Sequence, residues 1–153
     1  MKSFKDLVAF QRALDVAVAV YDVTAKFPKQ EMYGLVSQLR RAAIGVVSNI
    51  AEGQGRLTYG EWRKSLSDAR GSLYEVEAEA IAAQKLHFMN ERELQELTRL
   101  IRSCGGPLAG LIAWVRSKER STKQRSNPAT QQPGVSAAPR PRRANPPPRS
   151  PRS

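Results

Sequence analysis

Apolar residues recur every three or four positions in four separate blocks of the chain. This spacing places them along one face of an α-helix, so the pattern predicts four amphipathic helices. The predicted faces are Leu7, Phe10, Leu14, Ala17, Val18, Tyr21 and Ala25; then Leu35, Leu39, Ala42, Ala43, Val46 and Ile50; then Trp62, Leu66, Ala69, Leu73, Val76, Ala80 and Ala83; and finally Leu94, Leu97, Ile101, Leu108, Ile112 and Val115. No segment alternates with a period of two, so no strand is predicted.

Signals for helix ends separate the blocks. Pro28 ends the first block, because the residue before a proline avoids the helical region. Gly53 is expected to end the second block as a left-handed C-terminal residue. Thr58 and Asn90 begin the third and fourth blocks, and a glutamate three residues after each completes a capping box. Short connections favour antiparallel neighbours, so we predict an all-α, up-down-up-down four-helix bundle over residues 1–116.

The run Gly105-Gly106-Pro107 interrupts the fourth block. Proline inside a helix removes one backbone hydrogen bond and crowds the preceding turn. The apolar face stays in phase across the run, so we predict a kink or a short break and not a domain boundary.

The composition changes after residue 116. Large apolar residues almost vanish there, and proline, serine and arginine dominate, which predicts a disordered tail over residues 117–153. The tail holds nine basic residues and one acidic residue, +8 of the chain's formal charge of +11. Such a polycationic tail suits nucleic acid, with Arg140, Arg142 and Arg143 as candidate contacts, although a solubilising extension fits the composition equally well.

Cysteine content and hydropathy bear on the location of the protein. Cys104 is the only cysteine, so no disulfide forms within the chain. The chain has no apolar signal stretch and no run of about 20 apolar residues, so we expect a cytoplasmic protein without a membrane span.

A second set of apolar residues lies off the main faces of the first two helices. A helix with a second apolar face usually contacts another subunit, so the pattern predicts self-association. The alternative is that these side chains are scattered on the surface, as is common. They are Val8, Val16, Val20, Val23, Ile44 and Val47.

The stretch "SNIAEGQGR" (48–56) has two glycines, as phosphate-binding loops do. Those loops need a preceding strand and a different glycine spacing, so we interpret the stretch as a helix end and a turn. Gln38, Gly45, Asn49 and Glu52 form a polar strip beside the second apolar face, and Gly45 would allow a close helix approach. We expect Asn49 and Glu52 to bind the third helix or a neighbouring subunit.

No catalytic or metal-binding constellation is visible. His87 is the only histidine, and it lacks the Glu-x-x-His spacing of di-iron bundles. We expect it at the edge of the core. We therefore predict no enzymatic activity, no metal, no cofactor and no small-molecule substrate.

Basic residues gather near the connection between the second and third helices. They form either a phosphate-binding surface or a solvated, salt-bridged face, and both interpretations remain open. They are Arg40, Arg41, Arg56, Arg63, Lys64 and Arg70.

Three motifs of the chain occur in the same order as those of a known family. They are "FKDLVAFQRAL" (4–14), "FPKQEMYGLVSQLRRAAIGVVSNIAEGQGR" (27–56) and "DARGSLYEVEAE" (68–79). The chain resembles the bacterial four-helix-bundle family encoded in 23S ribosomal RNA intervening sequences. More distantly, it is similar to the accessory variability protein of diversity-generating retroelements. The motif positions are Gln38, Arg41, Asn49, Glu52, Gly53, Arg56, Gly71, Ser72 and Glu75.

The resemblance implies a non-enzymatic homopentamer that binds nucleic acid. Gly45 and Val47 stand where the family commonly has serine and proline, and the tail is not part of the family pattern. We expect an oligomeric scaffold for RNA or RNA–DNA hybrid, bound through backbone contacts. The alternative is a protein-interaction adaptor, such as an accessory subunit of a reverse transcriptase.

Overall fold

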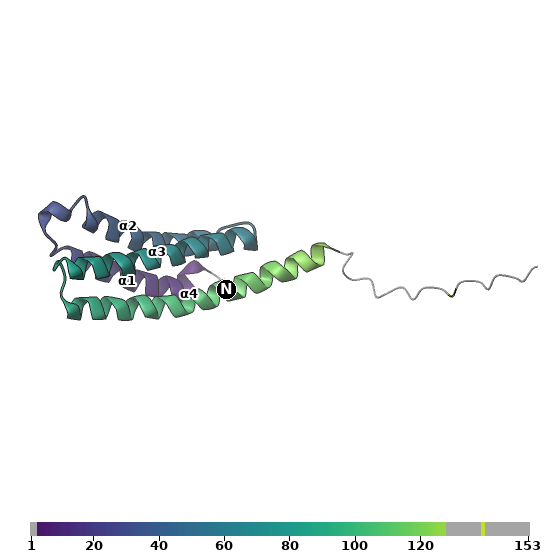
Figure 1. Cartoon of the computed structure of the whole chain (residues 1–153). Coiled ribbons are helices and arrows are strands. Elements are labelled where there is room, and N and C mark those ends of the chain that lie inside the picture. Colours follow the sequence, from purple (N-terminus) through teal and green to yellow (C-terminus); the bar gives the residue numbers. More distant parts are fainter. Residues whose placement is uncertain (1–2, 128–138, 140–153) are drawn as a thin grey trace, which may run out of the picture.

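The computed structural model describes residues 3–127 and residue 139. In chain order the elements are the 3-10 helix η1 (Phe4–Asp6), α1 (Val8–Thr24), the 3-10 helix η2 (Lys29–Glu31), α2 (Leu35–Gln54), α3 (Tyr59–Lys85) and α4 (Glu91–Ser126). No strand occurs among these described residues. The four long helices run antiparallel, with the α2–α3 turn at one end of the bundle and the other two connections at the opposite end (Figure 1). The predicted all-α four-helix bundle is confirmed.

The core lies between the four helices and uses the predicted faces of α2, α3 and α4. Its largest fully buried side chains include Leu39 and Ile50 of α2, Leu66 of α3 and Leu108 of α4. Among the residues predicted for these three faces, only Leu35, Trp62 and Leu94 are partly exposed. Burial of such side chains is the main stabilising contribution, about 1.5–3 kcal/mol for each large one.

The prediction for the first helix is only partly correct, because Leu7 and Ala17 of the predicted face are buried but its last residue, Ala25, is exposed. Val16 and Val20, expected outside, are fully buried, whereas Leu14, Val18 and Tyr21 are 42%, 61% and 43% exposed. Both faces of α1 satisfy the helical period, so periodicity alone cannot choose between them. The buried face combines these valines with small residues, which let α1 approach its neighbours closely: Ala9, Ala13 and Ala17.

Helix α4 is longer than the sequence predicts. It is continuous through Pro107, so the short break does not occur, and it bends as its second half runs past the end of the bundle, in agreement with the other predicted outcome, a kink (Figure 1). It also continues to Ser126, so residues 117–126 are helical and not part of a disordered tail. The helix extends this far because residues 117–126 contain no proline, and all but two of the chain's prolines lie at or beyond Pro128. The rest of the predicted tail, with Arg140, Arg142 and Arg143, lies outside the described residues.

Helix starts follow the sequence signals, but the end of α2 does not. Thr58 and Asn90 both form complete capping boxes, with Glu61 and Glu93 respectively. Gly53, expected as a left-handed terminal residue, is buried inside α2, and no described glycine has a positive φ. Its role is steric: a Cβ at this position would lie 2.6 Å from Trp62 Cδ1 on α3.

His87 ends α3 in the left-handed conformation that was expected of Gly53. Its φ is 62°, the one positive φ of a non-glycine residue in the described part of the chain. The His87 amide donates to the Gln84 carbonyl at 3.0 Å, and the Phe88 amide donates to the Ala83 carbonyl at 2.9 Å. These two bonds define a Schellman motif. His87 is exposed, so its predicted place at the core edge is wrong.

Replacing His87 with glycine should stabilise the bundle. A left-handed conformation costs a residue with a Cβ roughly 1–2 kcal/mol, and the flexibility of glycine in the unfolded chain cancels part of the gain. We expect the free energy of unfolding to rise by about 0.5–1 kcal/mol, measured by urea denaturation. His87→Ala serves as the control, because alanine keeps the Cβ; a similar gain for alanine would contradict the explanation.

Candidate nucleic-acid interface

Positive charge is concentrated where the α2–α3 turn meets the last part of α4. We call residues 52–64 and 114–126 the basic end. They carry eight Lys and Arg residues and three Glu residues, a net charge of +5. Residues 3–127 hold 19 basic and 14 acidic residues, which is also +5. The basic end therefore accounts for the whole net charge of residues 3–127, and the remainder of that range is neutral.

Glu119 joins α3 to α4 at the basic end. Arg63 Nε donates to Glu119 Oε2 at 2.7 Å, and Lys123 Nζ donates to Glu119 Oε1 at 2.9 Å. These two hydrogen bonds lower the pKa of Glu119 to about 2, so it remains a carboxylate throughout the neutral range. One carboxylate thus holds two cations in place.

The other cations of the basic end are weakly held or have no acidic partner. Arg56 pairs with Glu52 one turn away, and Lys64 lies 3.7 Å from Asp68. Both are exposed pairs of the kind that contribute little to stability, so a phosphate can replace the carboxylate. Three exposed arginines of α4 form no ion pair or hydrogen bond within residues 3–127: Arg116, Arg120 and Arg125.

Aromatic rings lie among these charges. The Tyr59 and Trp62 rings are stacked, with centroids 6.2 Å apart, and both meet Trp114 edge-on at 6.4 Å and 5.7 Å. Trp114 is 42% exposed, and Lys118 Nζ lies 5.4 Å from its ring centroid. The cluster therefore presents one fixed, half-exposed ring beside a cation.

A hollow of about 430 Å³, which we call the turn hollow, opens between the α2–α3 turn and α4. Two of its lining residues have buried polar atoms without a hydrogen-bond partner in the described part of the chain, Gln54 Oε1 and Trp62 Nε1. The turn hollow thus combines apolar surface with unused hydrogen-bonding capacity. It is lined by Gln54, Arg56, Leu57, Thr58, Tyr59, Trp62 and Thr122.

The six predicted basic residues of the bundle do not form one surface. Arg56, Arg63 and Lys64 lie at the basic end, whereas Arg40 is tied to α1. Arg40 Nε donates to Thr24 Oγ1 at 3.0 Å, and its guanidinium lies 4.6 Å from the Tyr21 ring centroid. The other two lie along the helices: Arg41 on α2 and Arg70 on α3, the latter 5.7 Å from the Tyr74 ring centroid.

Motif residues of α2 and α3 line a second hollow of about 400 Å³, the α2–α3 groove. The expected close approach at Gly45 is confirmed, since a Cβ there would lie 3.0 Å from Ser72 Oγ. Burial, with a smaller effect of Glu75, raises the pKa of Glu79. The groove is lined by Gln38, Arg41, Ala42, Gly45, Ser72, Glu75 and Glu79.

The expected hydrogen bonds of Asn49 and Glu52 to α3 are absent from residues 3–127. Glu52 pairs with Arg56, and the half-buried Asn49 side chain forms no hydrogen bond there. Gly71 is exposed, with open space where a Cβ would be. Contacts of Asn49 and Glu52 with a neighbouring subunit remain a prediction.

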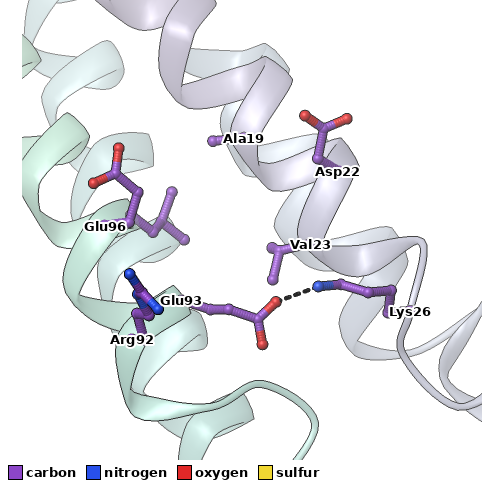
Figure 2. A pocket seen from close by; sticks show the side chains of 8 residues that line it. Ala19, Asp22, Val23, Lys26, Arg92, Glu93 and Glu96 are labelled. Carbon is purple, nitrogen blue, oxygen red and sulfur yellow. Dashed lines mark hydrogen bonds and ion pairs between the residues drawn. The ribbon is translucent and has the colours of Figure 1, made fainter.

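The hollow between α1 and α4 is a poorer candidate for an interface. Figure 2 shows Lys26, just after the end of α1, reaching Glu93 of α4, at 2.5 Å between Nζ and Oε2. Glu93 also closes the capping box of α4, and its pKa is lowered chiefly by the Lys26 hydrogen bond. Asp22 and Glu96 add negative charge to the lining. This hollow is held by a structural ion pair and does not favour a polyanion.

Other chemistry is limited in the described residues. Residues 3–127 and 139 contain no group of three His, Cys, Asp or Glu side chains placed to hold a metal ion. Burial, with a smaller effect of Asp15, raises the pKa of the Cys104 thiol to about 11, so it is protonated at neutral pH. Among the described helices, none has the length and hydropathy needed to cross a bilayer.

Sequence reasoning missed the residues that α4 contributes to the basic end. Trp114 lies off the predicted apolar face, and Lys118, Arg120 and Arg125 were assigned to a tail. A usable signal was present, because residues 117–126 contain no proline or glycine and can continue the helix.

The fold and the candidate site define a small four-helix-bundle protein whose positive charge and exposed tryptophan share one end. Comparison with known families matches residues 5–110 to the family described as 23S rRNA-intervening sequence protein. The match covers more than half of the chain, and the protein belongs to this family. No curated protein matches the chain. The family match stops before the last part of α4, so residues 114–126 lie beyond it.

Proposed function

We propose that the protein is a non-enzymatic, self-associating scaffold that binds nucleic acid, RNA or RNA–DNA hybrid, through contacts to the phosphate backbone. The observation that carries this proposal is the basic end, which holds the whole net charge of residues 3–127. Phosphate contacts from Lys and Arg supply most of the affinity of such proteins, and they do not require a catalytic group.

Self-association is supported by an apolar surface on α1 and α2. Leu14, Val18 and Tyr21 follow one another along α1 and are each more than 40% exposed. Because the two helices are antiparallel and Arg40 contacts Tyr21, Ile44 lies one turn further along α2, level with Val18. A contiguous apolar surface of this kind usually marks a protein interface. We propose a second copy of the chain as its partner and, from the family resemblance, a pentamer.

Assembly would multiply a modest charge. Each chain contributes one basic end, and several linked copies bind a polyanion with a high effective concentration. The same apolar surface could instead hold a different protein, such as a reverse transcriptase, which is the adaptor function. Capture of that partner from nuclease-treated extract, by a chain that stays monomeric alone, would favour the adaptor.

The test uses the full chain and a fluorescent RNA of about 20 nucleotides. Light scattering gives the mass, and anisotropy gives the dissociation constant between about 50 and 200 mM salt. We expect an oligomer whose affinity falls steeply over this range, because bound phosphates release counterions. An absence of binding at 50 mM salt, or affinity independent of salt, would contradict the proposal.

Replacing Glu119 with glutamine should strengthen RNA binding. The substitution removes one negative charge and frees Arg63 and Lys123 for phosphate, so we expect affinity to rise several-fold at low salt. Glu91→Gln is the matched control, because it makes the same change at the opposite end of the bundle. Equal effects of the two substitutions would show that overall charge, and not the basic end, governs binding.

A further inference from the structure

We propose that the basic end is a site for single-stranded nucleic acid, in which a base stacks on the exposed face of Trp114 and the adjoining backbone follows α4. The inference rests on the proposed function, and it narrows the ligand from RNA or RNA–DNA hybrid to a single strand and names the residue that recognises it. Duplex nucleic acid keeps its bases stacked inside and offers no free ring, whereas every unpaired base has an exposed face.

Trp114 has the properties of a stacking platform. Its edge contacts with Tyr59 and Trp62 fix the orientation of the ring, so little side-chain freedom remains to be lost on binding. The ring is nevertheless 42% exposed at the junction of α3 and α4. Lys118 Nζ lies over this ring, 5.4 Å from its centroid, and a base that stacks there would displace this flexible cation toward the adjoining phosphate.

A path for the backbone continues from Trp114 along α4. Trp114, Lys118 and Thr122 follow one another at intervals of one helical turn, and Arg125 lies on the same face. This part of α4 runs past the α2–α3 turn and out of the bundle (Figure 1). Two further exposed arginines, Arg116 and Arg120, lie on the opposite face of α4, where a single strand that wraps the free end of the helix can reach them.

The turn hollow lies beside this path, because Thr122 lines it. Its mouth includes Leu57, which is 98% exposed and gives an apolar contact for a second base. Gln54 Oε1 and Trp62 Nε1 are buried and have no partner in the described part of the chain, so a small shift of these side chains would offer a base an acceptor and a donor. These features suit a base, which has apolar faces and a polar edge. A duplex backbone would not use them.

The experiment compares a single-stranded RNA of about 20 nucleotides with the duplex of the same sequence, by anisotropy with the full chain. Trp114→Ala should weaken single-strand binding about tenfold, the range of one base stacked on an aromatic ring, and should change duplex binding less than threefold. Trp114→Phe should retain most of the single-strand affinity, because phenylalanine still stacks. Circular dichroism and light scattering verify that each variant keeps its fold and mass.

The matched control is Tyr74→Ala. Tyr74 is 59% exposed and also lies beside a cation, Arg70, but on the middle of α3. The Tyr74→Ala substitution should leave the affinity for the single strand unchanged. In a Trp62→Phe variant, Trp114 is the only tryptophan, and its fluorescence should be quenched on adding the single strand but not the duplex.

The outcomes separate this inference from the proposed function. Equal affinity for single strand and duplex, with no effect of Trp114→Ala, would overturn the single-strand site and leave nucleic-acid binding intact. The absence of binding to either RNA at low salt would overturn both.

Discussion

Replacing Gly53 with valine should lower the free energy of unfolding by about 2–3 kcal/mol. A Cβ alone would lie 2.6 Å from Trp62 Cδ1 and 3.2 Å from Ser65 Cβ, and valine adds two methyl groups to this contact. Overpacking of this kind typically costs about 1–3 kcal/mol, and Trp62 cannot move freely because Tyr59 and Trp114 pack against it. Urea denaturation of the full chain, followed by circular dichroism, measures the loss.

Gly110→Val is the control for this prediction. Gly110 also lies inside a helix, but nothing lies within 4 Å of the place where its Cβ would be. Valine has a somewhat higher helix propensity than glycine, so the change in stability should stay within about 0.5 kcal/mol. If both substitutions had the same effect, the close contact between α2 and α3 would not explain the presence of Gly53.

Neutralising three arginines of α4 should lower RNA affinity by tenfold or more at 100 mM salt. The variant Arg116→Gln/Arg120→Gln/Arg125→Gln keeps the length and the helix propensity of the side chains. The slope of log affinity against log salt concentration should also become less steep by about 2, if each arginine contacts one phosphate of a single strand. Anisotropy titrations at several salt concentrations measure both quantities.

The same number of charges can be removed from the opposite end of the bundle. Lys29→Gln/Lys85→Gln/Arg92→Gln changes three exposed residues at the α1–α2 and α3–α4 connections. This variant should bind RNA within about threefold of the parent chain, because charges separated by more than about 10 Å are screened at this salt. Equal losses in the two variants would argue for nonspecific attraction to the net charge.

Sequence reasoning identified three of the four buried faces, because α2, α3 and α4 each carry one dominant apolar face. It was only partly correct for α1, where two apolar faces compete and the choice depends on how closely the neighbouring helices approach. The side chains of Leu14 and Val18 are larger than those of Ala13 and Ala17, but size alone does not decide which face fits between two other helices.

The glycines and helix ends also divide into features that local sequence predicts and features that depend on contacts between helices. Capping boxes at Thr58 and Asn90 are local, so the sequence contains all the partners that they need. The role of Gly53 depends on Trp62, which belongs to another helix, and the left-handed position of His87 has no strong residue signature. Tertiary contacts of this kind do not appear as a spacing in the sequence.

Half of the predicted basic cluster belongs to the candidate site. Arg56, Arg63 and Lys64 are close in sequence to the α2–α3 turn, which made them visible as a group. The contribution of α4 comes from residues about 55 positions away. Two contacts bring the segments together: Glu119 pairs with Arg63, and Trp114 packs against Tyr59 and Trp62. The aromatic ring at the centre of the site, Trp114, was missed for the same reason.

Hydrogen exchange, followed by mass spectrometry on the full chain with and without saturating single-stranded RNA, tests the central claim most directly. The account predicts that RNA slows amide exchange in residues 52–64 and 114–126, while the connections at the opposite end of the bundle exchange at unchanged rates. Protection confined to residues 25–34 and 86–92, at full occupancy of the RNA, would contradict it.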